Sequence, residues 1–289
     1  MGHLFLRRRA GRFMRYRFLR YLQKAPIRIF KPMVSRLFTS WVMTDMLIAV
    51  LQHLGRDHSF SDELKEKNKW LGFLYLMKEK SFSQISQDLW VLYRTGQKMN
   101  GFFVEVGSCH PTNLNNTYLL EASYKWNGVL IEPNPGMAEL LRTQRTSTVL
   151  EFAVAEGEYI ELALAQNPEF SSTVAQLSHN KHKLHEPTGE IILAKCSTLT
   201  ELLTRVNCPK TFDFLSLDIE GGELYALTSL DFSRFRPNLI AVEHNFTESR
   251  KQISEYLKEN GYALDPLSSS TVWDDWYIDR RLLDSQKVD

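Results

Sequence analysis

The clearest pattern along the chain is a set of short apolar runs that end in acidic residues. The strongest examples are GFFVEVGS at 101–108, GVLIEPNP at 128–135 and FDFLSLDIEGGEL at 212–224. Near-continuous apolar strands are typical of parallel sheets covered by helices on both faces. Ligands of such sheets bind beyond the carboxyl ends of the strands, where the strand order reverses. The pattern therefore predicts that several acids meet at one ligand-binding edge.

From residue 101 onward, short strands alternate with helices, which is the signature of a βαβ sheet. We expect strands at 102–106, 128–132, 148–154, 212–218 and 238–243, and helices at 115–124, 136–143, 198–206, 222–230 and 248–260. Two strand-like pieces follow at 262–267 and 272–278, and segment 156–195 is expected to be irregular, with a long loop. The predicted fold class is α/β, a Rossmann-like, mostly parallel, doubly wound sheet with a helical N-terminal extension.

The N-terminal part of the chain has a different pattern. Residues 1–35 are predicted to form a basic amphipathic arm, residues 36–95 a helical extension, and residues 96–289 the α/β domain. The apolar tract at 37–51 is short for a membrane span and contains Asp45, so it reads as a buried or interfacial helix.

Composition changes this picture mainly through the placement of charge. The net charge is only +1, but residues 1–44 carry eleven Lys or Arg and no acid, which leaves 24 bases against 34 acids in the remainder. A basic arm beside an acidic body suggests an anionic partner. A membrane surface is favoured for residues 1–35. A basic helix docked on the body, or a disordered arm, is the main alternative, and nucleic acid is not expected.

The three cysteines, Cys109, Cys196 and Cys208, have no metal-ligand spacing and are odd in number. This favours a reducing compartment over a disulfide framework. No secretory signal follows the N-terminal arginines. The expected location is cytoplasmic, with membrane association through the arm.

The turn after the first strand favours a nucleoside ligand that lacks a phosphate chain. Gly107 is its only glycine, and no Walker motif is present. Glu132 ends the next strand and could accept hydrogen bonds from both ribose hydroxyls of an adenosine. S-adenosylmethionine fits this description. The alternatives are that Glu132 caps a helix and that Glu105 is a buried acid holding backbone amides.

Taken in order, FFVEVGS, NNTYLLE, WNGVLIEPNP, FLSLDIEGGEL and RPNLIAVEHN closely resemble FkbM-family methyltransferases over about residues 83–279. These are class I, S-adenosylmethionine-dependent enzymes, many of which O-methylate sugars or natural products. By position, the resemblance implies a cofactor site made of Glu105, Gly107, Asn116, Thr117, Glu132, Asn134, Phe152, Ala153, Asp218 and Glu220. The sequence CHP at 109–111 departs from the flexible, Gly-containing turn that is common in the family.

Methyl transfer to a hydroxyl needs a base or a bound metal, because a sugar hydroxyl is a poor acid. Asp218, Glu243 and His244 are the candidate catalytic residues. Together with Glu220 they could instead hold Mg²⁺, which prefers oxygen ligands. His244 could equally be a core histidine. The segment VWDDWYI at 272–278 could line an acceptor pocket, but an edge strand is favoured.

The expected function is O-methylation of a sugar, glycan or glycolipid-like hydroxyl. The alternative is a non-catalytic Rossmann-like binding module at a membrane surface, which the altered CHP turn keeps open. A nicotinamide-dependent dehydrogenase is a more distant possibility.

Overall fold

The computed structural model describes residues 62–165, 172–173, 187–244, 249–271 and 273–285. The chain divides into two compact units, Met1–Asn68 and Lys69–Asp289. The predicted arm at 1–35 and the extension before residue 62 lie outside the described residues, and the domain boundaries stay predictions. No described helix combines the length and the apolar character needed to cross a bilayer.

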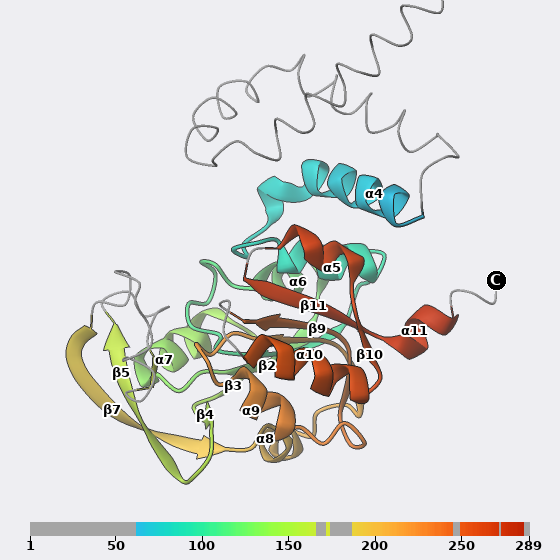
Figure 1. Cartoon of the computed structure of the whole chain (residues 1–289). Coiled ribbons are helices and arrows are strands. Elements are labelled where there is room, and N and C mark those ends of the chain that lie inside the picture. The colour runs from blue at the N-terminus through green and yellow to red at the C-terminus, as the bar shows by residue number, and fades with distance from the viewer. Residues whose placement is uncertain (1–61, 166–171, 174–186, 245–248, 272, 286–289) are drawn as a thin grey trace, which may run out of the picture. The chain divides into compact units, whose positions relative to one another are not determined.

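In the described part of the second unit, seven strands form one sheet in the order β10-β11-β9-β8-β1-β2-β3 (Figure 1). Their bounds are β1 Phe102–Val106, β2 Asn127–Ile131, β3 Thr148–Leu150, β8 Thr211–Leu217, β9 Arg236–Glu243, β10 Tyr262–Leu264 and β11 Asp274–Asp279. In this sheet the neighbouring strands β3, β2, β1, β8 and β9 are parallel to one another. Strand β11 pairs antiparallel with both of its neighbours, β9 and β10. The chain runs outward from β1 to β2 on one side and later from β8 to β9 on the other. The order therefore reverses between β1 and β8.

Helices cover both faces of this sheet. The helices of the described residues are α4 Asp62–Met77, α5 Gln87–Arg94, α6 Tyr118–Tyr124, α7 Pro135–Gln144, α8 Leu199–Arg205, α9 Glu223–Thr228, α10 Ser249–Glu259 and α11 Arg280–Ser285, with 3₁₀ turns at Lys78–Lys80 and Pro266–Ser270. Residues of α8, α9 and α10 pack in one core cluster and residues of α5, α6 and α7 in another. This confirms the predicted Rossmann-like, doubly wound fold.

Side-chain alternation along the strands assigns residues to the two faces. In β1, Val104 belongs to the cluster of α8–α10, and Phe103 belongs to the cluster of α5–α7. Side chains two positions apart in a strand point to the same face. Glu105, two residues after Phe103, and Ser216, two residues after Phe214, therefore point toward the α5–α7 side. Glu243, two residues after Ala241 of the same cluster, does so as well.

Segment 156–195 was predicted to be irregular, and this was wrong for its described residues. A second sheet has the order β4-β7-β5-β6, with β4 Ala153–Val154, β5 Tyr159–Ala165, β6 Ser172–Thr173 and β7 Pro187–Ser197. In Figure 1, β5 and β7 form a long pair that extends away from the main sheet. Its alternation is partial, because Leu162 and Ala194 are buried and Tyr159 and Leu193 are exposed, but Ala163 next to Leu162 is buried as well. Residues 174–186 of the predicted loop lie outside the described residues.

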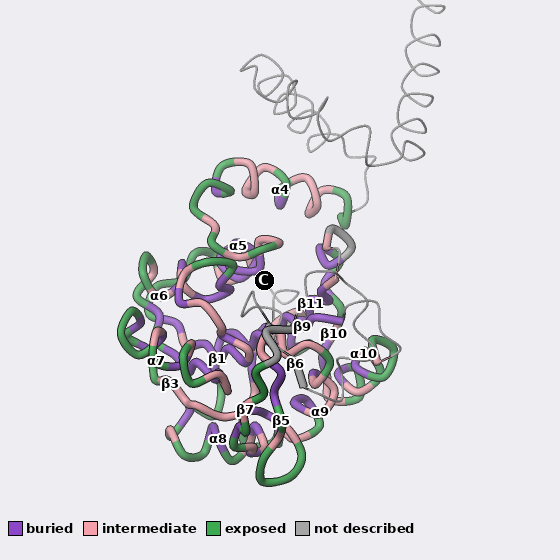
Figure 2. Tube along the Cα trace, turned by 90° about the vertical axis from the view of Figure 1, so that its left-hand side faces the viewer, coloured by how far each residue is buried: buried purple, intermediate pink, exposed green. Residues whose placement is uncertain are grey.

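Two other strand predictions need correction. The predicted strand 148–154 divides into β3 of the main sheet and β4 of the second sheet. The predicted edge strand at 272–278 is an inner strand, because β11 lies between β10 and β9. All six residues of β11 are buried (Figure 2). An inner strand needs cover on both faces, and Trp276 and Tyr277 pack into opposite core clusters.

Candidate functional site

The turn after β1 requires glycine at position 107. Gly107 has a φ of 82°, and a Cβ atom at this position would lie 1.7 Å from the backbone oxygen of Asp218. The Asp218 amide in turn donates a 3.1 Å hydrogen bond to the Val106 carbonyl. The ends of β1 and β8 are therefore in direct backbone contact at the point where the strand order reverses.

Glu105 is buried and accepts three hydrogen bonds from the loop that follows. The donors are Asn115 Nδ2 at 3.1 Å, the Asn116 amide at 3.0 Å and Thr117 Oγ1 at 2.8 Å. Burial raises the pKa of Glu105 to about 7, against the opposing charge of Arg145. These contacts are those of a buried acid that holds the loop in place. A direct role of Glu105 in cofactor binding stays a prediction.

The helix predicted to begin at residue 115 begins at Tyr118. Residues 115–117 are held outside it, because the Asn115 side-chain oxygen accepts hydrogen bonds from the amides of Thr117 and Tyr118, while Glu105 holds the Asn116 amide. Asn116 donates from Nδ2 to Ser216 Oγ at 3.0 Å. Its Oδ1 atom is buried and has no hydrogen-bond partner among the described residues. A buried acceptor without a donor is costly, so this atom indicates room for a ligand donor.

Glu132 joins the turn after β1 to the turn after β2. Its carboxylate accepts hydrogen bonds from the Cys109 amide at 2.9 Å and the Asn134 amide at 2.8 Å. Burial raises the pKa of Glu132 to about 7, although both amides oppose the rise. Asn134 caps α7 by accepting from the amides of Gly136 and Met137. The CHP turn is compatible with this junction, since its cysteine supplies one of the two donors to Glu132.

Phe152 and Ala153 lie where the chain passes from the main sheet to the second sheet. Phe152 follows β3, and Ala153 is the first residue of β4. Ala153 is buried and pairs with Cys196 of β7. The Phe152 ring is half-buried and lies 5.0 Å from the Arg205 guanidinium. Their predicted place near the adenine is not tested by these contacts.

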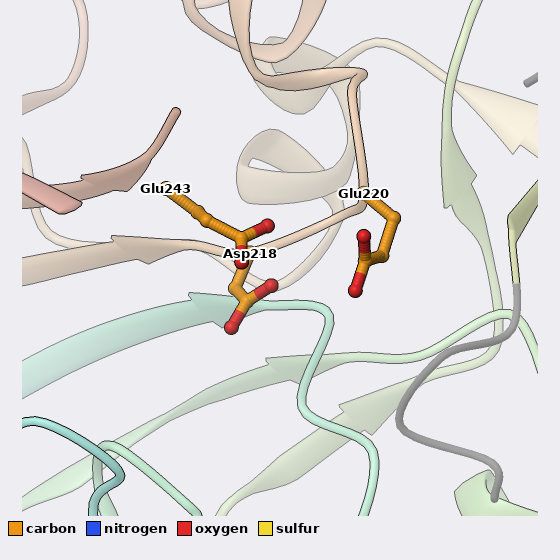
Figure 3. A group of neighbouring side chains, drawn as sticks. All are labelled: Asp218, Glu220 and Glu243. Atoms are coloured by element: carbon orange, nitrogen blue, oxygen red, sulfur yellow. The ribbon is translucent and has the colours of Figure 1, made fainter. Parts of the chain in front are cut away.

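Three acids converge at the carboxyl ends of β8 and β9. Asp218 and Glu220 follow β8, Glu243 ends β9, and one carboxylate oxygen of each lies within 4.8 Å of the others. Figure 3 shows Glu243 close to Asp218, with Glu220 reaching toward them from the turn after β8. This is the edge at which the sequence pattern predicted that acids would meet.

The electrostatics of the three acids favour a bound cation or bound protons. Burial, followed by the charges of Asp218 and Glu220, raises the pKa of Glu243 to about 12. Burial and the charge of Asp218 also raise the pKa of Glu220 to about 8. Glu243 is 8% exposed, and its Oε2 atom has no hydrogen-bond partner among the described residues. Carboxylates this close cannot all ionise unless a positive charge offsets them.

Two further acids shape this site and were not among the predicted site residues, although Asp274 lies in the segment 272–278 that was considered as an acceptor lining. Glu223 accepts hydrogen bonds from the amides of Ile219 and Gly221, and so closes the turn that carries Glu220. Asp274 accepts a 2.9 Å hydrogen bond from Gln87 Nε2. Burial and the charge of Asp218 raise the pKa of Asp274 to about 7. Asp274 opens a strand antiparallel to β9, which is why it lies at the same edge as the end of β9.

His244 is buried at the end of β9, and its amide donates a 2.7 Å hydrogen bond to the Trp273 carbonyl. Its Nε2 atom is 3.8 Å from Asp275 Oδ1, and Arg250 donates two hydrogen bonds to the Asp275 carboxylate. Burial lowers the pKa of His244, partly opposed by the charge of Asp275. A neutral imidazole is compatible both with a base and with a core histidine, so both interpretations stay open.

The comparison with protein families decides the identity of the chain. Residues 105–264, more than half of the sequence, match the methyltransferase FkbM domain. The chain belongs to the FkbM methyltransferase family. This confirms the resemblance seen in the sequence, and it makes the protein an S-adenosylmethionine-dependent methyltransferase with a class I, Rossmann-like fold.

Solved structures similar to this FkbM methyltransferase include a precorrin-6y C5,15-methyltransferase from Geobacter metallireducens, with 11% identity, a TM-score of 0.36 and coverage of 66% of this chain and 84% of the other. An O-methyltransferase from Bacillus cereus in complex with SAH has 12% identity, a TM-score of 0.35 and coverage of 81% and 97%. A methyltransferase from Pyrococcus furiosus has 12% identity, a TM-score of 0.34 and coverage of 74% and 96%. No match was found among curated proteins.

Proposed function

We propose that this FkbM methyltransferase transfers the methyl group of S-adenosylmethionine to a hydroxyl of a sugar, glycan or glycolipid-like acceptor. The observation that carries the proposal is the convergence of Asp218 and Glu243 at the ends of two adjacent strands, where His244 directly follows Glu243. These groups lie beyond the switch point of the sheet, beside the turn predicted to bind the cofactor. A hydroxyl acceptor needs such groups, since it must lose its proton during transfer.

For the cofactor, we propose a site that extends along the carboxyl edge from β8 to β3. The residues are those predicted from the sequence, Glu105, Gly107, Asn116, Thr117, Glu132, Asn134, Phe152, Ala153, Asp218 and Glu220. Two observations support the fit. Asn116 Oδ1 is a buried acceptor without a donor, as the cofactor's ammonium group requires, and Gly107 leaves the turn without a side chain. Glu132 would then lie on the ribose side.

In the proposed reaction the acceptor oxygen forms a bond to the methyl carbon while the bond from carbon to sulfur breaks. The sulfonium is already an activated donor, so the protein must align the acceptor and take its proton. We assign the proton to Asp218. Glu243, whose raised pKa keeps it protonated when no other cation is present, forms a hydrogen bond with Asp218 and would orient it. His244 stays a predicted catalytic residue, although its imidazole lies beside Asp275, on the other face of the sheet from Glu243.

A divalent cation such as Mg²⁺ is a second way to offset the charges of Asp218, Glu220 and Glu243. Oxygen ligands suit this ion, and a cation there would lower the pKa of a bound hydroxyl. Its test is a thermal melt of the wild-type protein with and without millimolar MgCl₂ at pH 8. We expect a higher Tm with the ion, and no such change in the Glu243→Gln variant. Equal Tm values for the wild type in both solutions would reject the cation site.

The central experiment combines Asp218→Asn with a screen of sugar and glycan acceptors that uses labelled S-adenosylmethionine. Loss of a positioned base typically costs about 10²–10⁴-fold in rate. We therefore expect turnover to fall by at least about a hundredfold, while calorimetry shows cofactor affinity within a few-fold of wild type. The exposed variant Glu255→Gln is the matched control and should leave both unchanged. Full activity in Asp218→Asn would remove this residue from the mechanism.

A second candidate function is a non-catalytic binding module. The observation that favours it is the altered turn at 109–111, in which Cys109 adopts a left-handed φ of 43°. Such a conformation is uncommon for a residue other than glycine. Calorimetry separates the two functions, because an enzyme must bind S-adenosylmethionine. Absence of binding at millimolar cofactor would favour the module.

For the basic arm at 1–35, we propose contact with an anionic membrane surface, which would hold a cytoplasmic enzyme near glycolipid-like acceptors. The support is the run of Lys and Arg without acids in the sequence. Deletion of residues 1–35 should weaken binding to vesicles that contain phosphatidylserine and leave binding to neutral vesicles unchanged. Equal binding of the full and the shortened chain to the anionic vesicles would reject the membrane role.

A further inference from the structure

Arg145 is a fully buried cation directly after α7, and its guanidinium holds both ends of the loop after β1. Nη1 donates to the Pro111 carbonyl at 3.1 Å and to Asn115 Oδ1 at 3.0 Å. Nη2 donates to Thr117 Oγ1 at 3.0 Å and to Glu121 Oε2 at 3.0 Å. A planar fork of donors suits this arrangement, and a lysine ammonium could not reproduce it.

The surroundings of the Arg145 guanidinium fix it in this position. It lies 5.9 Å from the centre of the Phe103 ring and 5.6 Å from that of Tyr118. Its ion-pair partner, Glu121, also accepts a hydrogen bond of 2.7 Å from the Thr146 amide. The side chain therefore has few other conformations available, although its buried Nε atom has no hydrogen-bond partner among the described residues.

We propose that Arg145 is a positioning residue for the amino-acid end of S-adenosylmethionine, an inference that rests on the cofactor site proposed above. Arg145 fixes Asn115 and Thr117, and both of these donate to Glu105. Glu105 then fixes the backbone of Asn116. The side-chain nitrogen of Asn116, Nδ2, donates to Ser216 Oγ. The Oδ1 atom of the same side chain is therefore left to accept a hydrogen bond from the cofactor.

The alternative is that Arg145 only holds α7 against α6 and contributes to stability alone. The two roles differ in their effect on Glu105. The charged groups around this carboxylate are Arg145, which lowers its pKa, and Glu132, with which it shares an unfavourable charge interaction. Ionised Glu105 is the acceptor that the loop donors require. Loss of the Arg145 charge should thus raise the pKa of Glu105 and move the rise in cofactor affinity to higher pH.

The experiment measures the Kd for S-adenosylmethionine by calorimetry from pH 6 to 9. Arg145→Lys is the conservative variant. Arg145→Met combined with Glu121→Gln removes the charge without leaving its buried partner unpaired. A buried acceptor that loses its hydrogen bond weakens binding, so we expect Kd to increase about 10- to 100-fold, which corresponds to about 1.4–2.8 kcal/mol. The KM for the acceptor should be unchanged, and the pH midpoint of the double variant should be higher. Arg142→Lys, at an exposed position three residues earlier, should behave like wild type.

The outcomes separate the two proposals. If wild type binds the cofactor and both Arg145 variants bind it with the same Kd and the same pH midpoint, the positioning role is overturned and the cofactor site stands. If the wild-type protein itself does not bind S-adenosylmethionine, the cofactor site is overturned, and the role of Arg145 with it. Should the double variant fail to fold, the Kd of Arg145→Lys alone decides, since that variant keeps the charge of Glu121's partner.

Discussion

Glu243 shows how strongly one side chain can respond to its neighbours at this site. It is nearly enclosed, two other carboxylates lie beside it, and one of its oxygens has no described partner. A carboxyl group of this kind must keep a proton or meet a cation. The protein therefore maintains at position 243 a residue that opposes folding, which is common where function rather than stability is served.

Replacing Glu243 should make stability less dependent on pH. The folded-state pKa is raised from 4.5 to about 12, so above pH 4.5 the folded protein holds a proton that the unfolded chain loses. Stability then falls as pH rises. Without added cations, Glu243→Gln should raise Tm by at least about 4 °C at pH 8, where 1 kcal/mol corresponds to about 2–4 °C, and by much less at pH 5. Thermal melts at both pH values check this. The same gain in Tm at pH 5 and pH 8 would contradict it.

Glu220 combines charge with backbone strain. Its φ is 55°, a left-handed conformation that costs about 1–2 kcal/mol for a residue with a Cβ atom. Glu220→Gly should relieve both terms, and Glu220→Gln should relieve only the charge. We expect denaturant melts to find Glu220→Gly at least as stable as Glu220→Gln, with reduced methyl transfer in both. A glycine variant clearly less stable than the glutamine variant would mean that the strain has no measurable cost.

At the residue scale, the sequence could locate acids at strand ends but not the groups that hold them. Glu132 and Asp218 each follow an apolar run, which made them visible. Ser216, Arg145 and Asp274 come from distant positions and share no spacing with the residues they contact. Only the pairing of strands and the packing of helices decide which groups they contact, so no local pattern could have predicted these contacts.

At the scale of elements, the junction of β1 and β8 depends on one glycine. The Cβ atom of Gly107→Ala would lie 1.7 Å from a backbone oxygen, and the residue would keep a positive φ. We expect a loss of about 3 kcal/mol or more in the free energy of unfolding, together with loss of cofactor binding. Urea denaturation and calorimetry measure these effects.

The matched control for this prediction is Gly72→Ala in α4. A Cβ atom at Gly72 has no heavy atom within 4 Å, and alanine is favoured over glycine inside a helix by about 0.5–1 kcal/mol. This variant should be as stable as wild type or slightly more so. Similar losses in the two variants would show that the close contact at Gly107 is not what matters.

Elements with a strong local pattern were predicted well. The strand at 102–106 has the predicted bounds, and the predicted helix at 198–206 is observed at Leu199–Arg205. The errors arose where tertiary contacts decide the outcome. Residues 115–117 were predicted to be helical but lie outside α6, because Glu105 and the Asn115 side chain accept hydrogen bonds from their backbone amides. The alternation in YIELALA at 159–165 is typical of a strand. Its partner, β7, could not be recognised because a long loop was predicted between the two segments.

At the scale of the whole molecule, helix α5, which precedes β1, forms hydrogen bonds with residues that follow β9. Asp265 accepts hydrogen bonds from Trp90 Nε1 at 2.8 Å and from Arg94 Nε and Nη2, both at 2.6 Å. Gln87, in the same helix, donates a hydrogen bond from Nε2 to the Asp274 carboxylate at 2.9 Å. Such ties explain why α5, which the sequence places before the α/β domain, packs in the core cluster of the sheet.

Removal of Asp265 should destabilise the whole Lys69–Asp289 unit. Its side chain is fully buried, and Asp265→Ala would remove the carboxylate that accepts two hydrogen bonds from the largely buried Arg94. Breaking a buried pair in this way typically costs about 3–5 kcal/mol. Urea denaturation followed by tryptophan fluorescence measures the loss, and Glu255→Ala, at an exposed position, is the control. A loss below about 1 kcal/mol would show that water replaces the carboxylate without difficulty.

The position of β11 has a consequence for the order in which the protein takes shape during synthesis. Although β11 is made after β10, it lies between β10 and β9, so β10 has no place in the sheet until β11 has emerged. Asp274 arrives with the same strand, and the group of acids at this edge lacks that residue until then. Pairings between distant segments form late in folding. The cluster of acids at the ends of β8 and β9 therefore gains its neighbour Asp274 only after β11 has been made.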